Sequence, residues 1–189
     1  MYEFFTYNCT LIVLLHILCE IDLGEFKMLF MSTYSSPIGD FRLLSTKTKL
    51  KKIILPSEDS NLNPAPEIKM NMPPILEECM KQLSMYFGGT LRSFSIPVEP
   101  DGTSFQLRAW TYLSTIEYGE TISYGTQASG IGIAKGGRAV GSANALNPIP
   151  IILPCHRVIG SDGKLRGYGG GSDLLYIKEY LLAHEKKNN

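Results

Sequence analysis

Short apolar runs separated by polar residues mark the first part of the chain. Residues 41–44 and 50–55 carry apolar side chains interrupted by Arg, Ser, Thr and Lys. Runs of this length with such interruptions are typical of half-buried strands. The pattern therefore predicts two or three β-strands over residues 32–56, and a further strand around residues 93–98.

The period changes to that of a helix over residues 74–87. Four side chains fall on one helical face there, namely Leu76, Cys79, Leu83 and Tyr86. Proline suits the first turn of a helix, where Pro73 and Pro74 lie, and Gly88-Gly89 ends it. Cys79 is interpreted as a small core residue. With residues 56–72 as a Pro- and Asn-rich surface loop, these elements predict a small α+β unit.

Residues 99–102 (Glu-Pro-Asp-Gly) are expected to separate this unit from a second one. Thr103 and Gln106 form a capping box for a helix that carries Trp110 as a core residue. Ser123 is placed to cap a short helix over residues 124–129. After a glycine turn at residues 130–132, a second helix is predicted over residues 134–145. A short helix, a glycine turn and a second helix are the outline of a helix-turn-helix.

The second helix of this pair is rich in small residues and carries one long cation, Arg138. Its small positions include Gly136, Gly137, Ala139, Gly141, Ser142, Ala143 and Ala145. Each helical glycine costs about 1 kcal/mol relative to alanine, so close approach to a surface is indicated. That surface is either DNA or a neighbouring part of the protein, and the pattern alone leaves both open.

A single cysteine lies in the most distinctive stretch, residues 147–160. The apolar residues 149–153 predict a buried strand, and Pro154 must end it or turn it. Cys155 then stands at a rigid corner, followed by His156 and Arg157. A base and a positive charge beside a thiol favour the nucleophilic thiolate. A carboxylate could fix the imidazole tautomer, although the residues alone do not choose which one.

Two further elements follow the cysteine. Residues 167–171 (Gly-Tyr-Gly-Gly-Gly) are predicted to form a mobile loop whose Tyr168 suits a flat ligand, or else a plain connector. Residues 174–185 are predicted to form a final helix.

The first 31 residues do not match this organisation. Their apolar run, residues 10–19, is shorter than the ~20 residues that span a bilayer, and no positive residue precedes it. We interpret residues 1–31 as an added extension, with Met28 or Met31 as an alternative start. A real packing segment, or a zinc site from Cys9, His16 and Cys19, is the competing interpretation.

Composition changes this picture little. Lys plus Arg equals Asp plus Glu, but the halves differ: residues 1–103 hold 9 basic and 12 acidic residues (9 − 12 = −3), and residues 104–189 hold 9 and 6 (9 − 6 = +3). Positive charge therefore lies with the Cys155 segment. The four cysteines show no disulfide spacing, which favours a reducing, cytoplasmic location and no membrane association.

These motifs together resemble the O6-alkylguanine-DNA alkyltransferases, also called methylated-DNA–protein-cysteine methyltransferases. The resemblance covers residues 104–185 in order and spacing. It rests on Pro154-Cys155-His156-Arg157-Val158 with Phe105-Gln106, Trp110, residues 118–121, 123–125, 138–141, 147–148, 167–171 and 181–185. A weaker similarity at residues 34–39 resembles the start of that family's first domain.

The resemblance implies a two-domain α+β fold. It places a ribonuclease H-like structural domain at residues 32–100 and a winged helix-turn-helix-like alkyltransferase domain at residues 101–189. It also implies irreversible, single-turnover repair of alkylated double-stranded DNA by a cofactor-free and metal-free monomer. The alkyl group of O6-alkylguanine, and of O4-methylthymine, would move to the cysteine after base flipping.

Specific residues take roles through the same resemblance. Catalytic roles go to Cys155, His156 through a bridging water, Glu185, and Tyr124 as proton donor. DNA contacts go to Arg138 as an intercalating finger and to Ala139, Gly141, Ser142 and Tyr124 in the minor groove. Asn147, Val158, Tyr168 and Gly169 would line the base pocket, with Asn147 as a hinge.

Few positions depart from the family pattern. Gly136-Gly137 replaces a better helix-forming pair, and Gly169 stands where a serine is usual. Two other functions compete with repair. A lesion-sensing DNA-binding module would not need Cys155, and a thiol hydrolase would give no reason for the helix-turn-helix.

Overall fold

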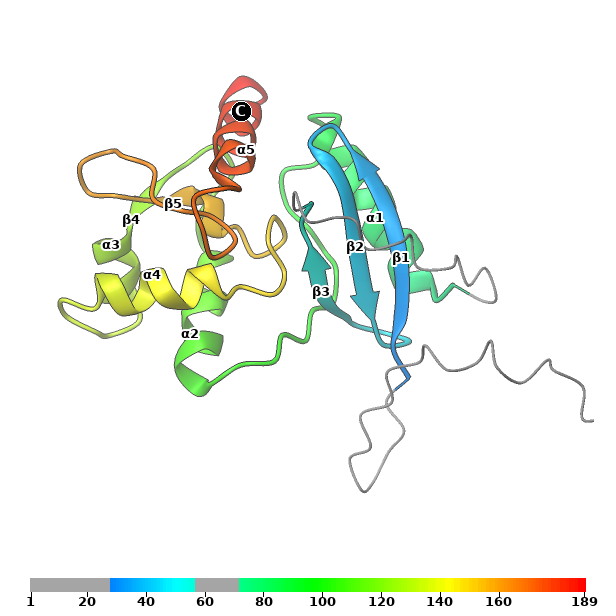
Figure 1. Cartoon of the computed structure of the whole chain (residues 1–189), viewed down its shortest axis with the longest axis horizontal. Coiled ribbons are helices and arrows are strands. Elements are labelled where there is room, and N and C mark those ends of the chain that lie inside the picture. The colour runs from blue at the N-terminus through cyan, green and yellow to red at the C-terminus, as the bar shows by residue number, and fades with distance from the viewer. Residues whose placement is uncertain (1–27, 57–71) are drawn as a thin grey trace, which may run out of the picture.

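The computed structural model describes residues 28–56 and 72–189, so the predictions for residues 1–27 and the loop at 57–71, the zinc ligands included, lie outside the described residues (Figure 1). Three antiparallel strands in the order β1-β2-β3 form the first sheet. They are β1 (Phe30–Ser36), β2 (Gly39–Ser45) and β3 (Leu50–Ile54), joined by short turns. The prediction of two or three strands is confirmed.

Helix α1 (Pro74–Phe87) packs against β1 and β2, as predicted from its period. The buried side chains of β2, Phe41 and Leu43, alternate with less buried ones, so one face of the sheet meets the helix. The rings of Phe41 and Phe87 lie 6.0 Å apart at this contact. The α+β unit expected at the start of the chain is therefore present.

The strand predicted at residues 93–98 is wrong. The segment makes a single isolated bridge, Val98 to Leu50, instead of a ladder. Leu50 donates its N–H to the Pro97 carbonyl and accepts from the Glu99 N–H, both at 2.9 Å. Pro97 has no N–H to donate, so pairing cannot extend as in a regular strand.

Three helices that pack against one another follow in residues 104–145. They are α2 (Ser104–Leu113), α3 (Tyr124–Gly130) and α4 (Gly137–Ala145). The capping box of Thr103 and Gln106 is formed, and the Ser123 side chain accepts from the Thr126 N–H as a cap. Trp110 donates from Nε1 to the Ala143 carbonyl at 2.8 Å, which ties α2 to α4. The helix-turn-helix arrangement of α3 and α4 is confirmed.

Helix α4 begins at Gly137, later than the predicted residue 134. Lys135 has a φ of 60°, a left-handed conformation that no helix continues, and Gly136 is the cap. The turn between the two helices is therefore longer than the glycine pattern indicated.

The strand predicted at residues 149–153 is also wrong. These residues form consecutive turns, and Ile151 has a φ of 74°. Pro148, Pro150 and Pro154 each remove a backbone donor, so no ladder can form across them. A short parallel pair, β4 (Ile122–Ser123) with β5 (Val158–Ile159), lies after the cysteine instead.

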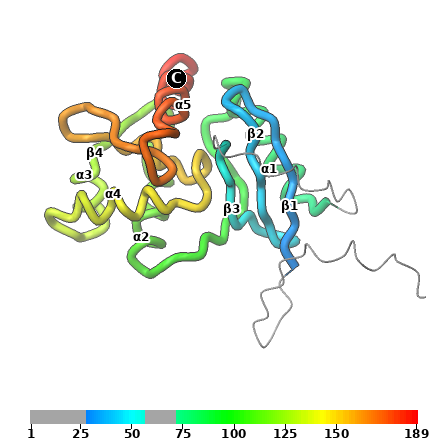
Figure 2. Tube along the Cα trace, viewed as in Figure 1, coloured from blue at the N-terminus to red at the C-terminus, as the bar shows by residue number. Residues whose placement is uncertain are grey.

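The last helix, α5 (Leu175–Lys187), lies at the boundary between the two halves (Figure 2). It was predicted over residues 174–185. A single hydrophobic cluster includes Phe41 and Leu83 from the first half and Trp110 and Leu181 from the second. The two halves therefore share one core.

Candidate active site

A closed turn presents Cys155. Asn147 holds this turn with both ends of its amide: Nδ2 donates to the Leu153 carbonyl at 2.7 Å, and Oδ1 accepts from the Ile149 N–H at 3.0 Å. The turn replaces the ladder bonds that the prolines exclude. Cys155 then opens a single 3-10 turn, η1 (Cys155–Arg157), and is 6% exposed. The thiol is fixed under the turn and is not part of a loose loop.

His156 and Glu185 form a buried pair beneath that cysteine. The Nε2 atom of His156 lies 2.8 Å from Oε1 of Glu185, and both side chains are fully buried. The carboxylate is ionised, so it fixes the proton on Nε2 and leaves Nδ1 as the basic nitrogen. Nδ1 has no protein partner within the described residues. The carboxylate that the sequence left open is therefore Glu185, 29 positions away.

Five hydrogen bonds hold the Glu185 carboxylate. Besides His156, Arg157 donates twice at 2.9 and 3.0 Å, the Tyr86 hydroxyl donates at 2.8 Å, and the Gly119 N–H donates at 3.0 Å. Burial alone would raise the pKa of Glu185, but the bonds and charges of His156 and Arg157 outweigh it and hold that pKa far below its usual range. Burial lowers the pKa of His156, opposed by Glu185. At rest the pair is a neutral imidazole beside a carboxylate.

Arg157 does not act on the thiol, contrary to what its position in the sequence indicated. Its guanidinium turns away to Glu185 and to the Ile116 carbonyl, which it meets at 2.6 Å. The cation that lowers the pKa of Cys155 is Lys178 on α5. Burial is the larger effect and raises that pKa, while the Asn147 side chain and then Lys178 oppose it. The thiol therefore needs a base before it can react.

Lys178 is the site residue that the sequence analysis missed. It is almost fully buried, and its Nζ donates to the Val158 carbonyl at 2.7 Å and to the Tyr124 hydroxyl at 3.4 Å. Burial lowers the pKa of Lys178, opposed by Cys155. Its signal was present, because Lys178, Leu181 and Glu185 share one helical face. A lysine on the buried stripe of a helix is seldom without a polar partner.

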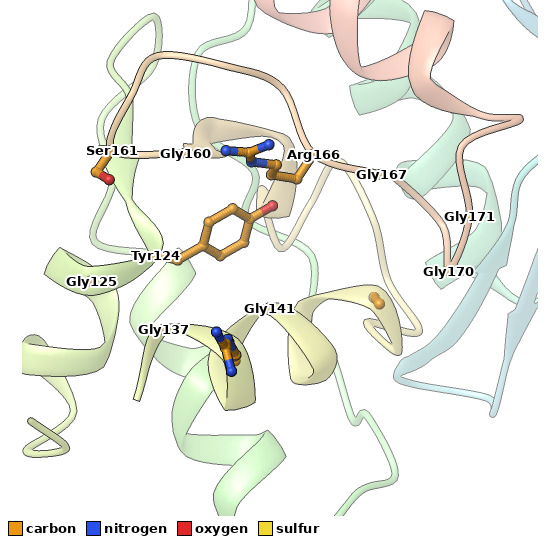
Figure 3. Close-up of a pocket in the computed structure, with 12 residues that line it drawn as sticks. Tyr124, Gly125, Gly137, Gly141, Gly160, Ser161, Arg166, Gly167, Gly170 and Gly171 are labelled. Atoms are coloured by element: carbon orange, nitrogen blue, oxygen red, sulfur yellow. The ribbon is translucent and has the colours of Figure 1, made fainter. Parts of the chain in front are cut away.

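A pocket of about 710 Å³ opens between the two DNA-recognition candidates, α3 and α4, and the loop of residues 160–171 (Figure 3). Tyr124 projects into it, and Arg166 lies on the opposite wall near the tyrosine hydroxyl. Arg138 and Gly141 also line it. Burial and then the Cys155 charge raise the pKa of Tyr124, while Arg166 lowers it. The tyrosine hydroxyl stays protonated at neutral pH and faces the cavity.

Two glycines of α4, Gly137 and Gly141, are not needed for packing within the protein. A Cβ added at Gly137 or Gly141 would approach other atoms no closer than 3.6 Å and 3.8 Å, which is ordinary contact. Both glycines line the pocket. Of the two surfaces that the sequence left open, a neighbouring protein element does not explain these two glycines. Ala139 and Ser142 are exposed on the same helix but do not line the pocket.

The predicted pocket residues divide into two groups. Asn147 and Tyr168 lower the pKa of Cys155, and the Val158 carbonyl accepts from Lys178, while Gly169 is exposed with a φ of 57°. None of the four lines the pocket of about 710 Å³. The expectation that Tyr168 presents its ring to a ligand from a mobile loop is wrong. Its ring is buried, its N–H donates to the Gly171 carbonyl at 2.7 Å, and burial, then Cys155, raise its pKa well above the usual value.

The described residues hold neither a cluster of metal ligands nor a membrane-spanning helix. Among the described residues, no three His, Cys, Asp or Glu side chains are grouped to hold a metal ion. Across residues 28–56 and 72–189, no helix has the length and apolar character needed to cross a bilayer.

The geometry describes a class of protein with a buried cysteine, a buried His–Glu pair next to it in sequence, and a helix-turn-helix. Comparison with known families identifies it further. Residues 104–187 match the 6-O-methylguanine DNA methyltransferase DNA-binding domain, and residues 29–100 match the ribonuclease-like domain of the same proteins. The chain belongs to the methylated-DNA–protein-cysteine methyltransferase family, and the predicted two-domain α+β fold is confirmed.

Curated relatives match this chain over most of its length and over almost all of their own. The methyltransferase of Methanosarcina acetivorans is 42% identical over 83% of this chain and 98% of its own length, and that of Mycobacterium bovis is 45% identical over 84% and 93%. A crystal structure of the Mycobacterium tuberculosis protein OGT in complex with DNA is 43% identical, covers 82% of this chain and 92% of its own, and has a TM-score of 0.71. A crystal structure of the O6-methylguanine methyltransferase of M. tuberculosis is 38% identical, covers 86% of this chain and 95% of its own, and has a TM-score of 0.70.

Proposed function

We propose that this protein repairs DNA by moving an alkyl group from O6-alkylguanine to Cys155 in a single irreversible step. Family membership supports the reaction class. The observation that supports the residue assignment is the buried His156–Glu185 pair, in which Nε2 lies 2.8 Å from Oε1. His156 directly follows Cys155 in the sequence, and its Nδ1 has no partner among the described residues. A thiol with a buried, oriented base beside it is the arrangement that nucleophilic catalysis requires.

The first step is loss of the thiol proton. Nδ1 of His156 takes it, through a bridging water, and Glu185 stabilises the imidazolium that forms. Lys178 and the Asn147 amide favour the resulting thiolate, since both lower the pKa of Cys155. Burial still keeps the pKa of Cys155 raised, so the thiol stays protonated until His156 takes its proton.

The second step forms one bond and breaks one. A lone pair of Sγ attacks the alkyl carbon, the carbon–O6 bond breaks, and its electron pair remains on the guanine. Tyr124 protonates the guanine anion, and the proton held by His156 returns to the tyrosine through solvent. The net change is thiol plus O6-alkylguanine giving thioether plus guanine, so no cofactor takes part in the balance.

The base must leave the duplex before this attack can occur, because O6 is not reachable inside the stack. We assign Arg138 to the space that the base vacates, with Gly137 and Gly141 letting α4 lie close to the minor groove. The pocket of about 710 Å³ between α4 and residues 160–171 would take the flipped nucleotide. One chain and one duplex suffice for this reaction, so the protein is expected to act as a monomer. The free thiol needs a reducing compartment such as the cytoplasm.

The experiment is intact-protein mass after incubation with duplex DNA that contains O6-methylguanine. A gain of one methylene per molecule, about 14 Da, is expected on the peptide with Cys155, and none in Cys155→Ala. A duplex with O4-methylthymine tests the second substrate in the same assay.

Two results would count against the proposal. DNA binding without a mass gain would favour a lesion-sensing module. Release of altered product from unmodified protein would mean a turnover enzyme, and the irreversible step would be wrong.

A further inference from the structure

The first domain contributes a side chain to the relay beneath Cys155. Tyr86 is the penultimate residue of α1, and its hydroxyl donates to Oε1 of Glu185 at 2.8 Å. The ring is fully buried, and 99 positions separate the two residues. Oε1 is the same oxygen that lies 2.8 Å from Nε2 of His156. Tyr86 and His156 therefore share one acceptor atom.

The same tyrosine also holds the neighbouring residue of α5. Its carbonyl lies 2.7 Å from Nε2 of His184, and its ring centroid lies 5.4 Å from that imidazole. This second contact anchors α5 whether or not the hydroxyl is present. The hydroxyl is thus separable from the anchoring contact, and its only hydrogen bond among the described residues is to Glu185.

We propose that Tyr86 is a positioning residue for the alkyl transfer, through which the ribonuclease-like domain limits the basicity of the Glu185–His156 pair. The inference rests on the proposed function. It differs from a purely structural role because it predicts a change in the pH dependence of Cys155 reactivity.

Each donor on a carboxylate disperses its negative charge and weakens it as a partner for the others. The Tyr86 hydroxyl stabilises charge on Oε1, so it reduces the support that Oε1 gives to an imidazolium at His156. Removing the hydroxyl leaves Arg157 and Gly119 to hold the carboxylate in place. The stronger carboxylate makes His156 more basic, so the imidazole stays protonated, and unable to accept the thiol proton, up to a higher pH. The loss of reactivity in acid should therefore begin at a higher pH than in the wild type.

Several ionisable groups face this pair from every side. They are Tyr86 from α1, Tyr118 before β4, Cys155 and Arg157 from η1, Tyr168 from the glycine-rich loop and Lys178 from α5. Burial, then the charge of Glu185, raise the pKa of Tyr86 well above the usual value. Tyr86 therefore remains a donor throughout the neutral range.

The test measures the rate of Cys155 alkylation by free O6-benzylguanine as a function of pH, which needs no DNA. Tyr86→Phe is expected to move the acid limb of the profile to higher pH by about half a unit. Tyr118→Phe is the matched control. Its ring is buried against Tyr86, with centroids 6.0 Å apart, and its hydroxyl has no partner in the described part of the chain. Its profile should overlay that of the wild type.

A second variant avoids any loss of packing. Replacing Tyr86 with 3-fluorotyrosine makes the hydroxyl a stronger donor with nearly the same shape, so the acid limb of the profile should move to lower pH. Coincident profiles for the wild type, Tyr86→Phe and the fluorinated protein would overturn the inference, as would an equal shift in Tyr118→Phe. If the wild type itself were not alkylated at Cys155, the proposed function would fail instead.

Discussion

At the scale of single residues, the site depends on one carboxylate that is buried and charged. Glu185 is fully buried, yet its pKa lies far below the usual range because His156 and Arg157 outweigh the effect of burial. A buried ion is tolerated only when its partners satisfy it. The price of this arrangement is sensitivity to acid and to loss of any partner.

Two groups make the protein less stable in acid. The pKa of His156 is lowered in the folded state, so below about pH 6.5 the unfolded chain takes up a proton that the folded chain does not. The pKa of Glu185 is also lowered, so its contribution is present above about pH 4.3 and is lost as the pH falls further. The free energy of unfolding, measured with urea, should fall in both windows.

Glu185→Gln separates the two windows. At neutral pH it should lower the free energy of unfolding by about 3–5 kcal/mol, because Arg157 is left buried without its counter-charge. Its acid dependence below about pH 4.3 should be flatter than that of the wild type. Parallel pH dependences for the two proteins would show that Glu185 is not charged in the folded state.

At the scale of elements, the turn of residues 147–153 and helix α4 do different work. The turn fixes the thiol through the Asn147 amide, whereas α4 presents Arg138 and two glycines to the pocket. Helices α1, α2 and α3 were predictable from the sequence for different reasons: α1 has an apolar face, α2 a capping box, and α3 a Ser123 cap. The cysteine turn was not predicted, because the apolar pattern of residues 149–153 indicated a strand although the surrounding prolines exclude a ladder. The Asn147 bonds that close the turn leave no pattern in the sequence.

Arg138→Ala tests the role of α4. Repair of O6-methylguanine in duplex DNA should slow about tenfold or more, since each 1.4 kcal/mol lost from flipping is a factor of ten. Alkylation by free O6-benzylguanine should be unchanged, because that reaction needs no flipping. The measurement is the rate of alkylation in both assays.

Lys135→Ala is the matched control for that experiment. Lys135 is an exposed cation in the turn before α4, and it does not line the pocket. It should leave both rates close to those of the wild type. Equal slowing of both reactions in Arg138→Ala would exclude the assignment to flipping.

At the scale of the whole molecule, the two domains form one physical unit. One hydrophobic cluster runs through both, the Ile53 N–H donates to the Pro148 carbonyl at 2.8 Å, and Tyr86 reaches the relay. The family motifs made the relay members predictable one by one. Tyr86 could not be placed, because a contact across 99 positions leaves no local pattern. Lys178 was missed although it shares a helical face with Leu181 and Glu185, because most lysines in helices lie at the surface.

The shared core predicts a single cooperative unfolding transition. Trp110, the only tryptophan, reports on the second domain by fluorescence. Cys79 reports on the first by labelling, since burial raises its pKa to about 12 and keeps it inert until α1 opens. Peptide mass assigns the label to Cys79. Trp110 fluorescence and Cys79 labelling should give the same denaturation midpoint. Separate midpoints would mean that the domains unfold independently.

The separation of Cys155 from other thiols has a consequence for how long an alkyl group would remain on the protein. Among the described residues the other cysteine, Cys79, is buried in the core beneath the first sheet. A thioether, unlike a disulfide, is not exchanged by thiols, so an alkyl group once received would stay for the lifetime of the molecule. On the proposed function, the mass of the added group would identify the alkylating agent. The alkylated fraction of the population would measure the dose, which makes the protein a molecular dosimeter of its own environment.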